Sequence, residues 1–419
     1  MKKLSFFSVI SILVFGGVVL TNALAQNTAA SVVPSAPDIN AAAYVLVDVN
    51  SGKVLAQKNA DQSRQPASLT KLMTLYLTFQ AIQNGSIQLD SKVRISEKAW
   101  KTGGSKMFVK VGTEVTVEDL IKGVIVDSGN DAAVALAQYV GGSVDSFVSL
   151  MNQQAKKLGM TQTHFSDPTG LPAPDHVSTA HDLSLLARAI IVNFPQEYKY
   201  FNIKWFTYSN IRQPNRNRLL WRYPGADGLK TGHTKEAGYC LIASAKKENT
   251  RLLSVVLGAA TDEERSGDSI ALLRYGFRFY QSQKLYDAGQ AVDNVRVWYG
   301  HDKYLPVGSP NAIYVTLPRT QFKNAKITTT LDNNLKAPID KGQTIGTMTV
   351  SVGDQTIQSI PIVALQADSK GGVLSRFMDA IAYTFHRWFG DSKRQVTTTV
   401  TIEKFTQAAN EKVASSTST

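Results

Sequence analysis

The chain combines an export signal with a single cysteine, and together these features limit how its fold can be stabilised. A basic Lys2-Lys3 pair, an apolar run from Phe6 to Leu20 and the site Ala23-Leu24-Ala25 predict a signal peptide over residues 1–25. The apolar run is short for a membrane span. Cys240 has no second cysteine to pair with, and its strand-like surroundings predict a buried side chain rather than a nucleophile. The exported fold must therefore be stabilised by a hydrophobic core. Apolar residues make up 43% of the chain, which is enough to form one.

The charge balance is strongly basic. The formal net charge is +12, and the two lysines of the leader account for two of these charges, so +10 remains on the rest of the chain. Such a balance favours anionic partners such as lipid headgroups, cell-wall polymer or nucleic acid. No run of Arg and Lys is interleaved with aromatic residues, so we do not expect a nucleic-acid partner.

The pattern of strands and helices predicts two folded domains. Residues 26–39 are rich in Ala, Ser and Pro and predict a flexible lead-in. Over residues 40–283, strand patterns at both ends enclose helical patterns, which predicts an α+β domain with one antiparallel sheet and helices packed on it. Residues 284–368 alternate short β-rich segments with turns and predict a small all-β domain. The predicted strands and helices of the first domain are 43–49, 54–57, 131–140, 145–158, 179–192, 238–245, 252–259 and 269–279.

Residues 371–390 predict an amphipathic helix. Apolar side chains recur there at helical spacing, and polar groups interrupt them too often for a membrane span. We expect this helix to lie on a membrane surface; the alternative is docking on the protein's own core. The tail over 391–419 is rich in Thr and Ser and is expected to be disordered, although 397–402 could form a strand on a partner's edge. The apolar positions are Leu374, Phe377, Met378, Ile381, Phe385 and Trp388.

Ser68-Leu69-Thr70-Lys71 places a hydroxyl and an amine on one face at the start of a predicted helix. Serine is a poor nucleophile at neutral pH, and a lysine whose pKa is lowered can serve as its base. The helix N-terminus also offers N–H groups to a developing oxyanion. Ser244-Ala245-Lys246-Lys247 has the same spacing, but it ends a strand, so its lysine would not face its serine.

Two further motifs complete a set. Ser128-Gly129-Asn130 brings a second hydroxyl and a carboxamide on a turn. Lys230-Thr231-Gly232 is predicted to lie on an edge strand, where the cation could attract a substrate carboxylate and lower the pKa of Lys71. Lys101-Thr102-Gly103 also matches this triplet, but it precedes the second motif and runs into a loop. Each motif alone is common, whereas the three in this order are specific.

With these motifs the chain resembles the low-molecular-weight penicillin-binding proteins, the serine-type D-alanyl-D-alanine carboxypeptidases of the peptidase S11 type. The resemblance covers nearly everything from the signal peptide to Gly390. It implies a penicillin-binding/β-lactamase-like transpeptidase domain, a small all-β domain and a C-terminal amphipathic helix. The resemblance also implies site roles. Ser68 is the nucleophile, Lys71 its base and Ser128 a proton relay; the substrate is held by Asn130, Lys230, Thr231, Gly232, His233 and Arg265.

The same resemblance implies the function. The expected reaction removes the terminal D-alanine from peptidoglycan stem pentapeptides by acylation of Ser68 and hydrolysis. β-Lactams would inhibit by acylating the same serine, and no metal or cofactor is expected. The expected location is the periplasmic face of the cytoplasmic membrane, with peripheral attachment through 371–390 and a role in cell-wall synthesis and cell shape.

Several alternatives remain. A class A β-lactamase needs a glutamate after the second motif, and none occurs from Asp119 through Gln196. Endopeptidase action on cross-links would use the same residues and stays open. A non-catalytic wall-binding protein would not need the full motif set. A metallopeptidase is disfavoured, since His164, His176 and His181 lack a ligand pattern and are interpreted as exposed loop residues.

Overall fold

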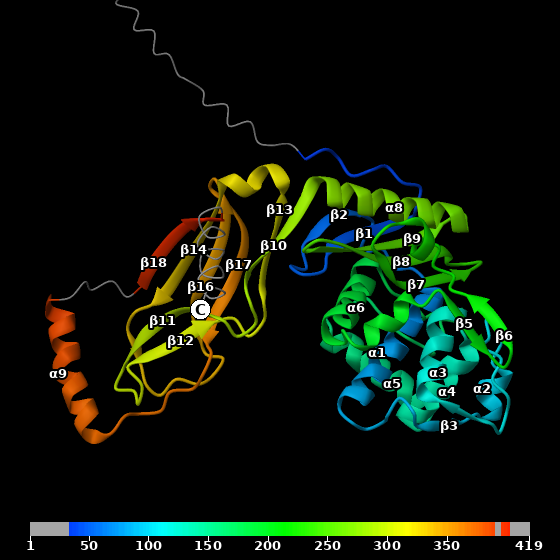
Figure 1. The fold of residues 1–419 in the computed structure, drawn as a ribbon, viewed down its shortest axis with the longest axis horizontal. Coiled ribbons are helices and arrows are strands. Elements are labelled where there is room, and N and C mark those ends of the chain that lie inside the picture. Colours follow the sequence, from blue (N-terminus) through cyan, green and yellow to red (C-terminus); the bar gives the residue numbers. More distant parts are fainter. Residues whose placement is uncertain (1–32, 390–394, 403–419) are drawn as a thin grey trace, which may run out of the picture. The chain divides into compact units, whose positions relative to one another are not determined.

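The structure is a computed structural model that describes residues 33–389 and 395–402. The predicted signal peptide, the lead-in as far as residue 32 and the chain from residue 403 onward lie outside the described residues. Within them the predicted α+β class is confirmed, since a mixed helix-and-sheet domain precedes a domain made almost entirely of strands (Figure 1).

The first domain is built on a five-stranded antiparallel sheet with the order β2-β1-β9-β8-β7. The predicted hairpin at Asn50-Ser51-Gly52 joins the first two strands, and Gly52 has a φ of 75°, which favours glycine. β1 pairs with β9, so the first and last strands share a layer as predicted, and β7 lies at an edge. The strands are β1 (Ala43–Asp48), β2 (Val54–Lys58), β7 (Ala226–Thr234), β8 (Gly238–Lys247) and β9 (Thr250–Ala259).

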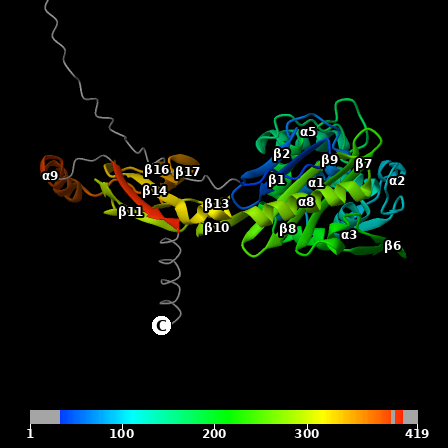
Figure 2. The same cartoon turned by 90° about the horizontal axis from the view of Figure 1, so that it is seen from above.

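Helices cover both faces of this sheet (Figure 1 and Figure 2). Side chains alternate along β1, so Val45 and Val47 join the core shared with α1, α4, α5 and α6, while Tyr44 and Leu46 join the core under α8. The longer helices are α1 (Lys71–Gln83), α4 (Asn130–Gly141), α5 (Val144–Lys157), α6 (Ala180–Asn193) and α8 (Asp262–Phe279).

Shorter elements connect the helices, and most of them were not predicted because three or four residues carry little periodicity. α8 also begins earlier than the predicted Ser269, because the Thr261 hydroxyl accepts the Glu264 N–H and caps the helix. The shorter elements are β3 (Lys92–Arg94), β4 (Glu114–Thr116), β5 (Trp205–Tyr208), β6 (Ile211–Pro214), α2 (Glu97–Lys101), α3 (Val117–Lys122), α7 (Leu219–Arg222), η1 (Ala67–Thr70), η2 (Gly123–Asp127) and η3 (Glu197–Asn202).

The second domain is a β structure with its own hydrophobic core. β10 (Tyr280–Tyr286) pairs with β13 (Ile313–Pro318), so the predicted boundary between 283 and 284 falls inside a strand. A seven-stranded sheet has the order β15-β11-β12-β17-β16-β14-β18. Its elements are β11 (Ala291–Trp298), β12 (Tyr304–Gly308), β14 (Ala325–Asp332), β15 (Leu335–Lys336), β16 (Thr344–Val352), β17 (Gln355–Ala364) and β18 (Gln395–Thr401), with the short turn η4 (Arg319–Asn324) between β13 and β14.

The helix α9 (Val373–Phe389) follows the β domain and leaves a row of apolar side chains exposed. In the part of the chain that the structure describes, no helix is both long and apolar enough to span a bilayer. The exposed apolar residues of α9 include Val373, Leu374, Phe377, Met378, Ile381 and Phe385.

The tail departs from the prediction of disorder over 391–419. β18 pairs with β14 in antiparallel register from Lys326 opposite Thr401 to Asp332 opposite Gln395. The edge strand that this segment needs is supplied by the chain's own β domain, not by a partner. The β-branched residues of β18 favour a strand once such an edge is available. The prediction of disorder is therefore wrong for 395–401.

Candidate active site

Ser68 and Lys71 lie one turn apart where the chain enters its first long helix. Ser68 belongs to η1 and Lys71 is the first residue of α1, as the i, i+3 spacing predicted. The Lys71 Nζ donates a hydrogen bond of 2.8 Å to the Ser68 Oγ. Ala67 has a φ of 47°, a conformation that a non-glycine residue keeps only where its surroundings hold it. The pair has the geometry of a nucleophile and its base.

Burial prepares Lys71 to act as that base. Its side chain is fully buried, and its Nζ also donates to the Thr169 carbonyl at 2.6 Å. Burial lowers the pKa of Lys71 from 10.5 to about 7; Asp167 opposes this shift and the charge of Arg216 adds to it. A substantial fraction of Lys71 is therefore uncharged near neutral pH and able to accept a proton.

The pKa of Lys71 predicts how acylation depends on pH. Only the uncharged amine can take the Ser68 proton, so the rate of labelling by penicillin should rise about tenfold per pH unit below 7 and level off above it. The measurement is the pseudo-first-order labelling rate across this range, with circular dichroism at each pH to confirm an intact fold. A rate that stays flat from pH 5 through pH 7 would mean that another group accepts the proton.

The second motif stands at the junction of a π-helical turn and α4. The turn η2 ends at Ser128, whose φ of 58° directs the chain into α4 at Asn130. The Asn130 Nδ2 donates to the Gly103 carbonyl at 2.6 Å. The Asp131 carboxylate accepts the N–H groups of residues 107–109, which fixes the same loop. Two neighbouring residues of α4 thus hold the loop beside the second motif.

The third motif lies on β7, at the edge of the sheet. Lys230 and Thr231 are buried, and the Lys230 Nζ donates to the Ser128 Oγ at 2.9 Å. A Cβ on Gly232 would lie 3.1 Å from the Pro66 carbonyl, so glycine lets this strand approach the turn that carries Ser68. His233 is exposed and stacks on Tyr239, with ring centroids 4.0 Å apart. All three motifs therefore meet at one place.

Lys230 and Lys71 lie close enough for their charges to interact, and Arg216 acts on both of them. Burial lowers the pKa of Lys230 well below its ordinary value, and the charge of Lys71 lowers it further. Beyond the effect of burial, the charge of Arg216 lowers the pKa of both lysines. Arg216 stands between β6 and α7, and no motif of the sequence marked it.

Comparison with known families decides the assignment. The profile of the peptidase S11 family, described as D-alanyl-D-alanine carboxypeptidase, matches residues 30–261. The chain belongs to this family. The profile of the penicillin-binding protein 5 C-terminal domain matches residues 280–370. The resemblance inferred from the three motifs is thereby confirmed.

Individual proteins similar to this S11 peptidase match part or most of the chain. D-alanyl-D-alanine carboxypeptidase DacC of Escherichia coli K12 is 46% identical over 363 residues, covering 85% of this chain and 91% of the relative. Penicillin-binding protein 5 of Haemophilus influenzae is 40% identical with a TM-score of 0.75, over 80% of this chain and 100% of that structure. Penicillin-binding protein D2 of Listeria monocytogenes in its ampicillin-bound form is 34% identical with a TM-score of 0.54, over 58% of this chain and 100% of that structure.

Arg265 of this S11 peptidase lies behind the third motif. Its Nη1 donates to the Gly232 carbonyl at 3.1 Å and to the Cys240 carbonyl at 3.3 Å, and it forms an ion pair with Asp262. The side chain is almost fully buried. Arg265 therefore braces the edge strand at Gly232. Cys240 is buried, as predicted, and burial raises the pKa of its thiol.

The sequence reasoning missed the loop that covers Lys71. The Asp167 carboxylate accepts hydrogen bonds from the N–H groups of Thr169 and Gly170. Burial raises the pKa of Asp167, but the hydrogen bonds of His176 and Thr169 outweigh it and lower the pKa to about 2. Gly170 has a φ of 86°, and a Cβ there would lie 1.8 Å from the Ala67 carbonyl. The Asp-Pro-Thr-Gly sequence is a turn signal, but a turn signal does not tell where the loop lies, here over Lys71.

His176 departs from expectation, and Asp127 is a buried acid that no motif marked. His176 is buried rather than exposed; its Nε2 lies 2.8 Å from the Thr70 Oγ1 and its Nδ1 is 3.3 Å from Asp167. Asp127, directly before Ser128, is buried, and burial together with Asp131 raises its pKa to about 7. Among the described residues, no group of three or more His, Cys, Asp or Glu side chains could hold a metal ion.

Proposed function

We propose that this S11 peptidase is a serine-type carboxypeptidase that removes the terminal D-alanine from peptidoglycan stem pentapeptides. The observation that carries the proposal is the hydrogen bond from buried Lys71 to Ser68, since it couples a nucleophile to a base whose pKa is about 7. The bond from Lys230 to Ser128 adds a second amine–hydroxyl pair at the same place. The carboxypeptidases to which the chain is similar support the choice of substrate.

The proposed reaction has two stages. The Ser68 Oγ attacks the carbonyl carbon between the two D-alanines as its proton passes to the Lys71 Nζ. The C–N bond then breaks, and the departing amine receives a proton through Ser128, which leaves an ester on Ser68. Water attacks this ester, and the proton that it loses passes through Lys71, so that the shortened peptide and free Ser68 are released.

Substrate binding uses the edge of the sheet. The peptide would lie along β7, where Gly232 leaves room, with the Asn130 carboxamide holding a peptide carbonyl. The backbone N–H groups of Ser68 and His233 would receive the oxyanion. The terminal carboxylate would face Lys230 and Thr231 and would favour the charged form of Lys230. Arg265 would support this end of the strand from behind, through the Gly232 carbonyl.

Release of D-alanine tests the proposed substrate. The purified chain should release free D-alanine from a peptide ending in D-Ala-D-Ala and should leave the same peptide ending in L-Ala-L-Ala intact. The protein could fail to release D-alanine from the D,D peptide while penicillin still labels it. That result would overturn the carboxypeptidase assignment but not the assignment of Ser68 as the nucleophile.

Endopeptidase action on peptide cross-links is the second candidate, because the same residues could cleave a cross-linked peptide. The open edge of β7 does not by itself limit the size of the substrate. Rates on a pentapeptide and on a cross-linked dimer of the same stem, measured side by side, distinguish the two. We expect the pentapeptide to be preferred, and the opposite order would favour the endopeptidase.

We further propose that the protein is exported and attached to the periplasmic face of the cytoplasmic membrane through α9. Two contacts support this orientation. The Asp379 carboxylate accepts the Tyr299 N–H at 2.8 Å, and the Tyr383 ring packs on Trp298 with centroids 5.1 Å apart. This face of α9 docks on the β domain, whereas the apolar face around Leu374 and Phe377 stays exposed. A helix held in this way can present its apolar side to a membrane surface.

Truncation tests the attachment. A chain that ends at Lys370 should no longer sediment with membranes, and its hydrolysis of a soluble peptide should be unchanged. This truncation also removes β18. A full-length Leu374→Ser/Met378→Ser variant therefore tests the apolar face of α9 without the loss of that strand. Each lost apolar side chain weakens burial by about 1.5 kcal/mol or more, so binding should fall roughly a hundredfold. Unchanged sedimentation of both proteins would overturn the assignment.

A further inference from the structure

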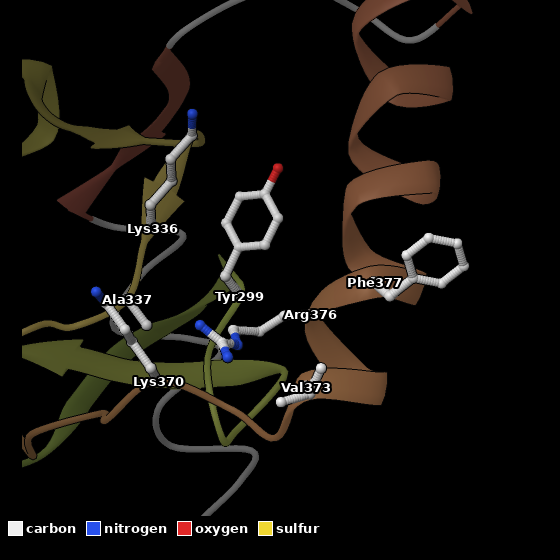
Figure 3. A pocket seen from close by; sticks show the side chains of 7 residues that line it. All are labelled: Tyr299, Lys336, Ala337, Lys370, Val373, Arg376 and Phe377. Carbon is white, nitrogen blue, oxygen red and sulfur yellow. The ribbon is translucent and has the colours of Figure 1, made fainter.

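A hollow of about 490 Å³ lies where the chain passes from the β domain into α9. In Figure 3 the Arg376 side chain extends from α9 toward the side of the hollow where Lys370 stands, while the Lys336 amine points away from both. The Tyr299 ring stands between Arg376 and Lys336. Val373 and Phe377 of the apolar face line the same hollow. Positive charge and exposed apolar surface therefore meet at one end of α9.

Two of the cations that line the hollow, Lys370 and Arg376, are not neutralised by the part of the protein that the structure describes. Among the described residues, no carboxylate forms an ion pair with Lys370 or Arg376, and both side chains are exposed. The neighbouring acids bind other groups. Asp379 pairs with Arg296 and accepts the Tyr299 N–H, and Asp368 accepts the N–H groups of residues 301 and 302. An anion entering the hollow would find two available cations.

The hollow is held in place by the same contacts that dock α9. Lys336 lies over the Tyr383 ring, 4.5 Å from its centroid, and the Gly371 N–H donates to the Tyr299 carbonyl at 2.9 Å. Residue 370 itself forms a bridge with Gly300. These contacts fix the backbone of α9 against the β domain, so the positions that carry Arg376 and Lys370 keep a constant separation along the chain's surface.

We propose that this hollow binds the phosphate of an anionic phospholipid, with the Arg376 guanidinium and the Lys370 ammonium as its ligands. Arginine can contact two phosphate oxygens at once, and lysine adds a point charge. The ligand is a lipid and not free phosphate, because Val373 and Phe377 continue from the hollow into the exposed apolar face, where acyl chains would lie. The inference rests on the proposed attachment through α9 and adds a preference for anionic headgroups.

Vesicle binding tests the proposal. The probe is the processed chain from Gln26, mixed with vesicles of phosphatidylcholine alone or of phosphatidylcholine containing phosphatidylglycerol. Lys370→Gln/Arg376→Gln should lose roughly thirtyfold in affinity for the anionic vesicles, since each basic residue at such a surface contributes about fivefold. Its binding to neutral vesicles should be unchanged. Lys323→Gln/Lys341→Gln removes two exposed lysines of the β domain outside the hollow, and it should lose threefold or less.

The outcomes separate the site from the attachment. An equal loss in both double variants would mean attraction by net charge and would overturn the site. Equal binding of the unmodified chain to both kinds of vesicle would overturn it as well while leaving the anchor intact. If the chain binds neither vesicle, the attachment itself fails. Protection of the fold by inorganic phosphate without any preference for anionic vesicles would assign the hollow to free phosphate and contradict the proposal.

Discussion

Ser68→Ala is expected to lower kcat for D-alanine release roughly a millionfold, the scale seen when the serine nucleophile of a protease is removed. Labelling by penicillin should disappear completely, because Ser68 is the hydroxyl that receives a hydrogen bond from buried Lys71, whose pKa is about 7. The measurements are single-turnover hydrolysis and covalent labelling at saturating penicillin.

Ser244→Ala is the matched control, since Ser244 begins the second S-x-x-K sequence of the chain. Ser244 is buried in β8 and its Oγ accepts a hydrogen bond of 2.9 Å from Arg251, so it serves the sheet and not the site. Loss of this bond should cost about 1 kcal/mol of stability, and labelling should remain. Retained labelling in Ser68→Ala would show that the wrong serine has been chosen.

Lys71→Met is expected to slow acylation by about a hundredfold to ten thousandfold, the usual contribution of a general base. Methionine is similar in length and carries no charge, so the core around residue 71 remains filled. The variant should unfold at a temperature no lower than the parent, because the buried ammonium disfavours the folded state. Loss of activity together with undiminished stability separates a catalytic role from a structural one.

The stability difference should itself depend on pH. The pKa of Lys71 is about 7 in the fold and 10.5 ordinarily, so between these values the unfolded chain binds more protons. The free energy of unfolding of the parent therefore rises with pH across this window, and the advantage of Lys71→Met is largest below pH 7. Lys101→Met changes an exposed lysine and should leave both activity and this pH slope unaltered. A parent slope that persists in Lys71→Met would contradict the assigned pKa.

The sheet and long helices of the first domain could be predicted because their residues alternate or recur over enough positions to reveal the buried face. Tyr44 to Val47 show both faces of β1, and the helix predicted to start at 179 begins at Ala180. The two-stranded sheets β3–β4 and β5–β6 could not be predicted, since a strand of three or four residues shows no period. β18 was predicted only as a strand that could form on a partner's edge, because the edge it uses, β14, lies far away in sequence.

The three motifs could be found in the sequence, but the charged groups that surround them in the fold could not. Ser68 with Lys71 is a local pair one helical turn apart, and it was visible in the sequence. Arg216 and the Asp167–Gly170 loop reach Lys71 only through folding, and isolated residues in loops carry no spacing that marks them. Sequence reasoning therefore assigned the lowering of the Lys71 pKa to Lys230, the one distant cation that a motif had brought into view.

The central claim is tested most directly by mass spectrometry of the intact protein after brief exposure to penicillin, followed by mapping of the modified peptide. One penicilloyl group should be present, attached to Ser68, and it should persist after free drug is removed, because no glutamate follows the second motif as far as Gln196. An adduct on any other residue, or rapid turnover of penicillin with no adduct, would contradict the account.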